Sequence, residues 1–251
     1  CFIKSLLFER SFLNFNNPKL FNIIFIIKSP KQHIKTDDGS STLYIKELKE
    51  SYHSRNGAVV ESRYIYLKQG LEYWISNNPN KTCRILELGY GTGLMSYLTM
   101  QYSENKQKDL ELTTLEAYPL TSDELETLNY ESYFENLPIL SFKKFSNLPW
   151  DKIHEVSQNF KLLKKVIKFE DFLIDHVYDV IFYDAFGSHA QPELWTYNCM
   201  KKCNDLIAPN GIWVSYCAKG SVRRDLETIG FEVSRLPGPP GKREMLRAIK
   251  V

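Results

Sequence analysis

The chain has 251 residues, of which 43% are hydrophobic and 25% are charged, as is typical of a globular protein of one large domain or two small ones. The formal net charge of +2 is too small to identify a nucleic-acid partner by itself. Five scattered cysteines, with no histidine cluster or second pair near Cys199 and Cys203, predict no metal site. We therefore expect reduced thiols and a cytoplasmic protein.

The first 35 residues carry little structural information. Their apolar run LFNIIFII has eight residues, whereas a membrane-spanning helix needs about 20. No small-residue cleavage site of a signal peptide follows the run. We expect no membrane association, and we interpret residues 1–35 as an extension whose true start is unknown.

Residues 36–80 are predicted to form a hairpin and a helix. Asp38 and Gly39 form a turn signal between two extended stretches, which favours a small hairpin. From about Ala58 to Ser76 the apolar residues recur at helical spacing. We expect this unit to cover a pocket formed by residues 81–251.

From residue 81 onward, predicted strands and helices alternate. Nearly continuous apolar runs such as RILEL and DVIFYD are typical of strands covered on both faces. The pattern predicts a Rossmann-like, doubly wound α/β fold with a mostly parallel sheet. Its last stretch, FEVSRLPGPPGKREMLRAIKV, predicts a C-terminal antiparallel hairpin. The strands are expected near 84–88, 110–115, 162–168, 179–184 and 211–216, and the helices near 93–103, 121–136, 192–206 and 220–229.

A glycine-rich turn in RILELGYGTGLMSYL follows the first of these strands. No lysine follows Gly93, which excludes a triphosphate-binding loop, and Leu94 stands where a dinucleotide-binding fingerprint has its third glycine. The remaining pattern, Glu87 followed by Gly89, Gly91 and Gly93, resembles the S-adenosylmethionine motif of Rossmann-like methyltransferases. Glycine lets the backbone of such a turn approach the cofactor closely. We therefore predict S-adenosylmethionine as the cofactor.

Acidic residues near the ends of three strands extend this prediction. Glu87 is expected to orient the turn or to meet the ammonium group of the cofactor. Glu116 ends the second strand, where an acid in doubly wound folds can accept hydrogen bonds from both ribose hydroxyls. In methyltransferases an acid after the third strand commonly meets the adenine amino group, and either Asp171 or its neighbour Glu170 suits this role.

Asp184 emerges at the carboxyl end of the fourth strand, beside the cofactor crevice. Methyl transfer to nitrogen needs a neutral amine held in line with the methyl group. A carboxylate at this place can accept the proton of the amine and orient its lone pair. Asp184 is therefore the predicted catalytic residue.

A set of motifs in fixed order is similar to one known family. DGSSTLY, YHSRNGAVVESRYIY, LELGYGTGL, LEAYPL, FYDAF with QPELW, and KGSVRRDLETIGF with GPPGKREML occur in this order over roughly residues 36–251. Together they resemble the methyltransferase domain of the bifunctional tRNA methylaminomethyl-thiouridine biosynthesis protein. Two departures are Met95, where the family often has Asn, and Gly187, where it often has Pro.

The resemblance implies an activity and further site residues. Members of the family transfer a methyl group from S-adenosylmethionine to the aminomethyl group on the wobble uridine of certain tRNAs. His53, Ser54 and Glu61 would line the pocket from its N-terminal side. The chain would be a stand-alone form of the domain, and a separate flavin-dependent enzyme would supply the aminomethyl tRNA.

Basic residues outnumber acidic ones from Lys219 to Val251, so a nearly neutral chain can still present one basic face to tRNA. The lysines of residues 143–168 are instead expected to be ordinary solvated side chains. Aromatic side chains could stack on a splayed base. The candidates for phosphate contacts are Arg223, Arg224, Lys242 and Arg243, and those for stacking are Tyr52, Phe186 and Trp195, the last of which suits the core equally well.

Three other functions remain open at this point. A methyltransferase acting on another amine, in a small molecule, a protein or another nucleic acid, would share every cofactor residue. A non-catalytic S-adenosylmethionine-binding protein could keep the fold, although Glu87, Glu116 and Asp184 argue against it. A nicotinamide oxidoreductase is disfavoured by Leu94.

Overall fold

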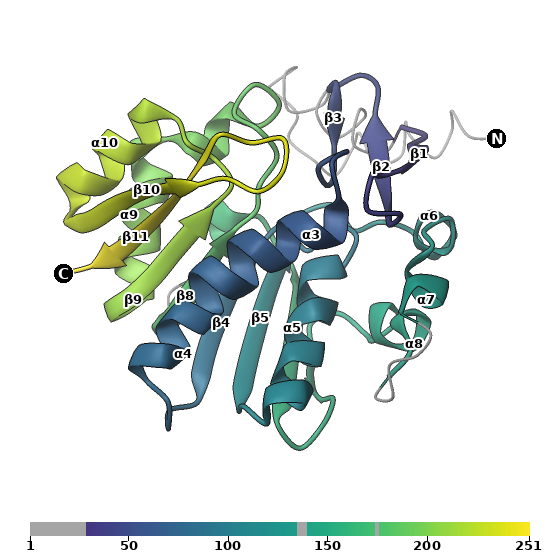
Figure 1. Cartoon of the computed structure of the whole chain (residues 1–251), viewed down its shortest axis with the longest axis horizontal. Coiled ribbons are helices and arrows are strands. Elements are labelled where there is room, and N and C mark those ends of the chain that lie inside the picture. Colours follow the sequence, from purple (N-terminus) through teal and green to yellow (C-terminus); the bar gives the residue numbers. More distant parts are fainter. Residues whose placement is uncertain (1–28, 135–139, 174–175) are drawn as a thin grey trace, which may run out of the picture.

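The computed structural model describes residues 29–134, 140–173 and 176–251. Within these ranges the chain forms a small sheet and a large one (Figure 1). The small sheet has the order β1-β2-β3 and is antiparallel, and the turn at Asp38 and Gly39 joins its first two strands, as predicted. Its strands are β1 (Gln32–Lys35), β2 (Ser41–Ile45) and β3 (Glu50–Ser51).

The large sheet has the order β10-β11-β9-β8-β4-β5-β7-β6 among the described residues. Neighbours from β9 to β7 pair in parallel, whereas β11 and β6 run antiparallel to the strands beside them. The doubly wound sheet and its C-terminal hairpin of β10 and β11 are thereby confirmed. The strands are β4 (Cys83–Leu88), β5 (Leu110–Glu116), β6 (Ile153–Glu155), β7 (Phe160–Val166), β8 (Tyr178–Tyr183), β9 (Ile207–Ser215), β10 (Phe231–Pro237) and β11 (Glu244–Lys250).

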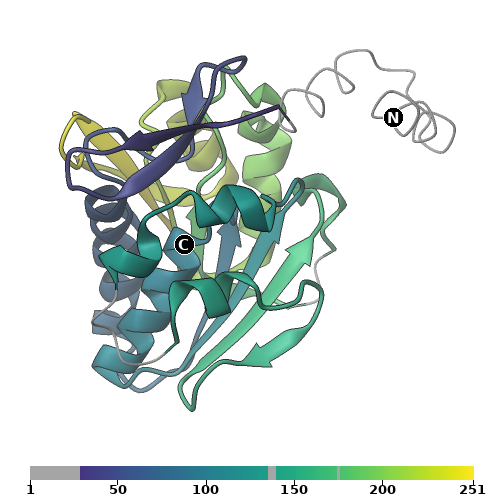
Figure 2. The same cartoon turned by 90° about the vertical axis from the view of Figure 1, so that its right-hand side faces the viewer.

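Helices cover both faces of the large sheet. Alternate strand residues point to opposite faces, so that Phe182 packs into one core and Tyr183 into the other. The helix over Ala58–Asn77 and α5 cover the first face, and α9 and α10 cover the second (Figures 1 and 2). These helices are α3 (Ala58–Ser62), η1 (Arg63–Glu72) and α4 (Tyr73–Asn77), which are continuous, α5 (Leu94–Lys106), α9 (Tyr197–Leu206) and α10 (Gly220–Ile229).

The middle of the long N-terminal helix, η1, is a π-helix of ten residues. Such helices are rare and often occur at functional sites. A Cβ added at Gly70 would lie 2.8 Å from a Val214 methyl group, so this glycine lets the helix lie close against the sheet. The sequence correctly predicts this helix, but its apolar spacing carries no signal for the π-helical geometry.

Two predicted helices are interrupted. The segment predicted as a helix over 121–136 forms α6 (Ser122–Glu126) and α7 (Tyr130–Tyr133), and its last two residues lie outside the described ranges. The segment over 192–206 starts with the 3₁₀ turn η3 (Pro192–Trp195), and α9 begins only after Thr196. Thr196 is extended and its hydroxyl accepts a hydrogen bond from the N–H of Cys199, which starts a new helix.

Some elements carried no recognisable sequence signal. The edge strand β6 has three residues, and α8 (Phe142–Ser146) has five. Elements this short contain too few residues to display a periodicity. The capping box of Thr121 and Glu124 at the start of α6, by contrast, is present as predicted.

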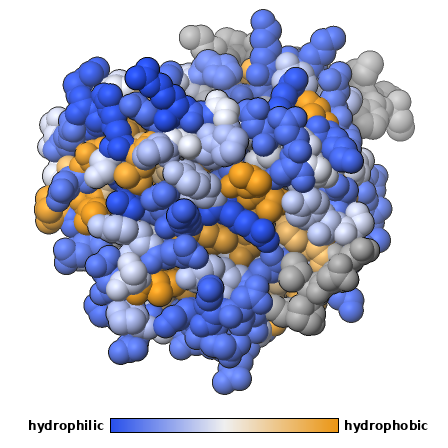
Figure 3. Space-filling view, viewed as in Figure 1, coloured by the Kyte–Doolittle hydropathy of each residue, from blue (hydrophilic) through white to orange (hydrophobic). Residues whose placement is uncertain are grey.

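The small sheet lies above the carboxyl ends of the central strands of the large sheet in both ribbon views (Figures 1 and 2). On the face shown in Figure 3, hydrophobic residues gather in small patches among hydrophilic ones. A groove between the long helix and α5 is lined by Val60, Tyr64 and Tyr102, among others.

In the part of the chain that the structure describes, no helix is both long and apolar enough to cross a membrane.

Candidate active site

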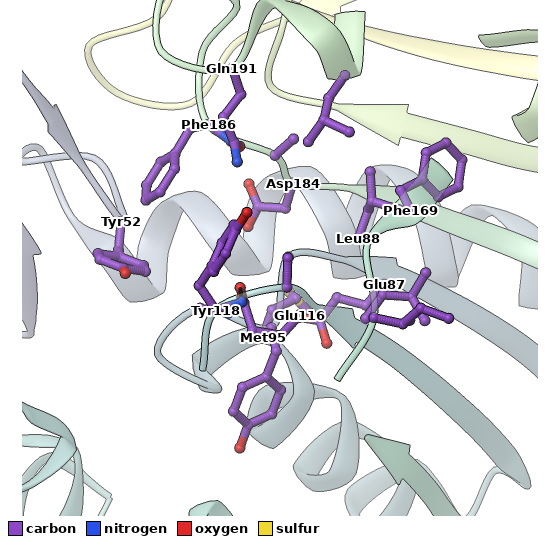
Figure 4. Close-up of a pocket in the computed structure, with 18 of the residues that line it drawn as sticks. Tyr52, Glu87, Leu88, Met95, Glu116, Tyr118, Phe169, Asp184, Phe186 and Gln191 are labelled. Carbon is purple, nitrogen blue, oxygen red and sulfur yellow. Dashed lines mark hydrogen bonds between the residues drawn. The ribbon is translucent and has the colours of Figure 1, made fainter. Parts of the chain in front are cut away.

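A pocket that is open to solvent lies at the carboxyl ends of β4, β5 and β8, and we call it the cavity. In the order of the chain, the strands after β4 extend the sheet first to one side and then to the other, and ligands of open α/β sheets bind at such a switch point. In Figure 4, Tyr52 and Phe186 lie on one side of the cavity and Leu88 and Phe169 on the other, with Asp184 between them. The strand ends and the segment after β3 therefore converge on one site.

The glycine turn forms one wall of the cavity. Gly89, Gly91 and Gly93 have φ values of 90°, 51° and 79°, in the left-handed region that favours glycine. A Cβ on Gly89 would lie 2.7 Å from the backbone oxygen of Asp184. The turn therefore needs glycine both for its dihedral angles and for its close approach to the loop after β8.

Glu87 is fully buried beneath this turn and lines the cavity. Its Oε2 accepts a hydrogen bond from the hydroxyl of Ser96, and the hydroxyl of Thr114 also acts on the carboxyl group, although Oε1 makes no hydrogen bond of normal geometry with the described residues. Burial raises the pKa of Glu87 to about 8. A carboxyl group with spare acceptor capacity at the wall of a cavity fits the ammonium group of S-adenosylmethionine.

Glu116 ties the glycine turn to the end of β5. Its Oε2 accepts a hydrogen bond of 2.9 Å from the N–H of Gly91, and its Oε1 accepts one of 2.9 Å from the N–H of Tyr118. Burial raises the pKa of this carboxyl group despite these hydrogen bonds. Each carboxylate oxygen keeps a second lone pair, so the group retains acceptor capacity on the cavity wall.

Asp171 lies away from this wall. It is exposed at the end of η2 (Phe169–Asp171), and its N–H donates to the backbone oxygen of Lys168. Glu170 is exposed as well, and neither acid lines the cavity. The tight turn directs Phe169 inward and leaves both acids in solvent, so the adenine contact stays a prediction.

Asp184 follows β8 directly and lines the cavity. Its N–H donates to the backbone oxygen of Leu88 at 3.0 Å, which joins it to the end of β4. The hydroxyl of Tyr66, in the π-helix η1, donates to Oδ1 of Asp184 at 2.6 Å. Burial raises the pKa of Asp184 to about 7, and the hydrogen bond from Tyr66 opposes this rise. The carboxyl group can therefore gain or lose a proton near neutral pH.

The YHSRNGAVVES segment contributes to the same cavity as Asp184, and its three predicted site residues have different roles. His53 lines the cavity and its Nε2 lies 2.7 Å from the hydroxyl of Thr92. Burial lowers the pKa of His53 to about 4, so the imidazole is neutral at pH 7. Ser54 contributes its N–H, which donates to Oε2 of Glu61 at 2.9 Å. Glu61 is buried and pairs with Lys242 at 2.7 Å.

The loop after Asp184 is held by hydrogen bonds to Tyr216, Trp195 and Glu50. Tyr216 donates its hydroxyl to the backbone oxygen of Ala185, and Trp195 donates its indole N–H to that of Phe186. The N–H of Gly187 donates to Glu50. This fixed loop places the ring of Phe186 at 5.0 Å from that of Tyr52, in an edge-to-face arrangement. Trp195 itself is buried in the core, the alternative left open above.

The basic candidates differ in their surroundings. Lys242 lies beside the site, whereas Arg223 pairs with Glu227 on its own helix at 2.5 Å. Arg224 and Arg243 are exposed. The expectation for the lysines of 143–168 is wrong for Lys164, which is fully buried and lies 4.9 Å from the Tyr90 ring centre and 4.5 Å from that of Trp150. A cation that is stacked on two aromatic rings leaves no mark in the local charge pattern.

Tyr66 and Tyr216 were not identified from the sequence. Both lie at apolar positions of regular elements or just after them, where a tyrosine is indistinguishable from a core residue. Only the packing of η1 against β8 brings the Tyr66 hydroxyl to Asp184. No grouping of three metal-binding side chains occurs among residues 29–134, 140–173 and 176–251.

Comparison with known proteins bears directly on this site. A model of an S-adenosyl-L-methionine-dependent methyltransferase family matches residues 146–251. An uncharacterised protein of Methanocaldococcus jannaschii is 28% identical over 236 residues, which cover 90% of this chain and 62% of that protein. The tRNA 5-methylaminomethyl-2-thiouridine biosynthesis bifunctional protein of Hydrogenovibrio crunogenus is 30% identical over 210 residues, which cover 77% of this chain and 30% of that protein.

The chain therefore matches less than two thirds of the first relative and about a third of the bifunctional protein. The crystal structure of MnmC2 from Aquifex aeolicus superposes with a TM-score of 0.69 at 24% identity, covering 98% of this chain and 81% of that one. These findings confirm the resemblance stated above, the Rossmann-like methyltransferase fold and S-adenosylmethionine as the cofactor.

Proposed function

Because the chain carries an S-adenosylmethionine-dependent methyltransferase domain similar to that of the bifunctional tRNA-modifying proteins, we propose that it methylates the aminomethyl group on the wobble uridine of tRNA. The observation that carries this proposal is the half-buried carboxyl group of Asp184, held by Tyr66 at the wall of the cofactor cavity. A carboxyl group in this position is suited to a primary amine.

The cofactor half of the cavity has the groups to hold S-adenosylmethionine. The glycine turn would contact its methionine portion, Glu87 its ammonium group and Glu116 its ribose hydroxyls. When bound, S-adenosylmethionine supplies a methyl group on a sulfonium, which an amine nitrogen can attack directly, and it leaves as S-adenosylhomocysteine.

Asp184 would prepare the amine. A primary amine is largely protonated at neutral pH, and its ammonium form has no lone pair for attack. The ionised Asp184 would accept one N–H proton, and its fixed orientation would aim the nitrogen lone pair. Its pKa of about 7 lets Asp184 be ionised when the amine arrives and release the proton afterwards.

The aromatic pair Tyr52 and Phe186 would hold the uracil base. Both rings lie at the cavity wall on one side of Asp184, where a base flipped out of the anticodon loop can stack (Figure 4). The exposed Arg224 and Arg243 would contact phosphates of the tRNA. The names of the curated relatives, which refer to synthesis of a methylaminomethyl nucleoside in tRNA, support this substrate.

The test is methylation of tRNA whose wobble uridine carries the aminomethyl group and has not yet been methylated. Purified protein is incubated with methyl-labelled S-adenosylmethionine and this tRNA, and the digested nucleosides are separated. We expect label in methylaminomethyl uridine with the wild type and at least about a hundredfold slower labelling with the Asp184→Asn variant. Fully modified tRNA is the control substrate. Label in no tRNA nucleoside, although S-adenosylmethionine binds, would overturn the proposed substrate.

A further inference from the structure

Three segments that are far apart in the chain meet around Glu61. The Tyr216 ring that packs on this cluster donates its hydroxyl to the backbone oxygen of Ala185, the residue after Asp184, at 2.8 Å. Glu61 accepts a hydrogen bond from the N–H of Ser54 through Oε2, and its Oε1 lies 2.7 Å from Nζ of Lys242. The same ammonium group lies 3.9 Å from the centre of the Tyr216 ring. Lys242 therefore has a carboxylate and an aromatic face as partners in a half-buried position.

The loop that carries Lys242 is held in place from both ends. This loop joins β10 to β11, and the hydroxyl of Tyr64 donates to the backbone oxygen of Pro237 at its start, at 3.0 Å. Gly241, next to Lys242, lies so close to Asn56 that a Cβ would be 1.9 Å from Nδ2. The position of the Lys242 ammonium is thus built into the fold.

The pair determines the charge beside Asp184. A carboxylate of Asp184 with the Glu61–Lys242 pair carries a net charge of −1, which one cationic amine would neutralise. The charge of Glu61 raises the pKa of Asp184, and that of Lys242 lowers it. Asp184 and the titratable groups packed around it influence each other's pKa. These groups are Tyr66, Glu61, Lys242, Glu87 and Tyr216.

We propose that the Glu61–Lys242 pair sets the charge balance at the amine end of the cavity, so that the site selects a cationic primary amine and keeps Asp184 able to take its proton. This inference rests on the proposed function and assigns to each member of the pair an opposite effect. Glu61 keeps the site attractive to a cation by cancelling the charge of Lys242. Lys242 keeps Asp184 ionised by cancelling the charge of Glu61.

Single substitutions therefore shift the balance in opposite directions. In Glu61→Gln, the uncancelled Lys242 repels an ammonium group and lowers the pKa of Asp184. In Lys242→Met, the charge of Glu61 acts on Asp184 without a cancelling cation, so the pKa of Asp184 rises and more of the group is protonated at neutral pH. The double variant loses both charges and returns the pKa of Asp184 toward that of the wild type.

The experiment measures both properties. The pKa of Asp184 is determined by carboxyl ¹³C NMR, with Asp184→Asn to assign its signal, and we expect shifts of about half a unit or more in opposite directions. Binding of 5-aminomethyluridine, with uridine as the neutral comparison, is measured by calorimetry in the presence of S-adenosylhomocysteine. Glu61→Gln should weaken binding of the amine about tenfold and leave uridine unchanged.

The ion pair of Lys201 and Asp205 on α9, at 2.9 Å, provides matched controls. Lys201→Met and Asp205→Asn change the same charges and should leave the Asp184 titration unchanged. Equal or absent shifts in the two site variants would overturn the inference, because a merely structural pair does not move a pKa in opposite directions. Opposite shifts support it, and failure of the wild type to bind 5-aminomethyluridine would then overturn the proposed substrate alone.

Discussion

The two halves of the cavity are built in different ways. The cofactor half comes from one continuous strand, turn and helix, from β4 to α5, with Glu116 joined to it across one strand pair. The amine half is assembled from η1, the segment after β3, the end of β8 and the loop between β10 and β11. A local motif determines the first half, whereas only the complete fold determines the second.

This difference separates binding from catalysis. Changes in the glycine turn should lower cofactor affinity, because the backbone itself forms that wall. Changes around Asp184 should alter the rate and its pH dependence while the cofactor still binds. A substitution in one half that changes the property of the other half would break this separation.

Asp184→Asn should have the largest effect on turnover. The amide keeps the shape of the side chain and cannot accept a proton from an ammonium group, so we expect kcat to fall by a factor of about 10² to 10⁴. Calorimetry with S-adenosylhomocysteine should give an affinity close to that of the wild type. A large loss of cofactor affinity in this variant would show that the two halves are not separable.

Gly89→Ala should have the largest effect on cofactor binding. Its Cβ would meet the backbone oxygen of Asp184 at 2.7 Å, so either the turn or the loop after β8 must move. We expect cofactor affinity to fall about tenfold or more, on top of a strain of about 1–2 kcal/mol from the positive φ. Gly39→Ala is the matched control, because Gly39 has a φ of 84° and no atom within 4 Å of its Cβ position.

Both glycine variants should lose thermal stability, and only Gly89→Ala should lose affinity. Calorimetric titration and thermal unfolding of the two variants make the comparison. Equal cofactor affinities in the two would mean that close approach at Gly89 is unimportant for binding.

The sequence predicts the cofactor half of the cavity better than the amine half. The parallel sheet and the glycine turn, with Glu87 and Asp184 beside it, follow from local patterns: apolar runs, glycine spacing and acids at strand ends. Tyr66 has no such signal, because its role depends on how closely η1 packs against the sheet at Gly70. The burial of Lys164 depends likewise on two aromatic rings that lie elsewhere in the chain.

Asp171 shows what the order of elements leaves undetermined. An acid after the third strand suits an adenine contact by its place in the topology. The 3₁₀ turn that follows β7 instead buries Phe169 and exposes Asp171. Within one short turn the choice between an inward apolar side chain and an inward acid is decided by burial, which the order of elements does not reveal.

Tyr66→Phe should shift the pH dependence of catalysis. The hydroxyl donates to Asp184 and opposes the rise of its pKa, so its loss should raise that pKa further. The acidic limb of the kcat profile should move to higher pH, and kcat at pH 7 should fall severalfold. Tyr97→Phe removes a hydroxyl that donates to the backbone oxygen of Leu140, outside the Asp184 network, and should leave the limb in place. An unshifted limb in Tyr66→Phe would remove Tyr66 from the amine half.

Glu87 should affect the pH dependence of stability, the smallest of these effects. Burial raises its pKa from 4.5 to about 8 in the folded protein. The folded state therefore holds this proton more tightly than the unfolded chain, and the stabilisation is lost as pH rises through 8. Asp184, with a pKa of about 7, acts in the same direction, whereas His53, with a pKa of about 4, acts oppositely and only below pH 6.5.

Between pH 6.5 and 8 the free energy of unfolding of the cofactor-free protein should therefore decrease as pH rises. Each proton contributes at most about 1.4 kcal/mol per pH unit. Glu87→Gln should flatten this decrease, as measured by urea unfolding at several pH values. In the wild type, a cationic group bound at Oε1 of Glu87 would favour the ionised carboxyl group, so cofactor binding near pH 7 should release protons. Calorimetry in buffers of different ionisation enthalpy measures that release, and an equal release in Glu87→Gln would separate Glu87 from the ammonium site.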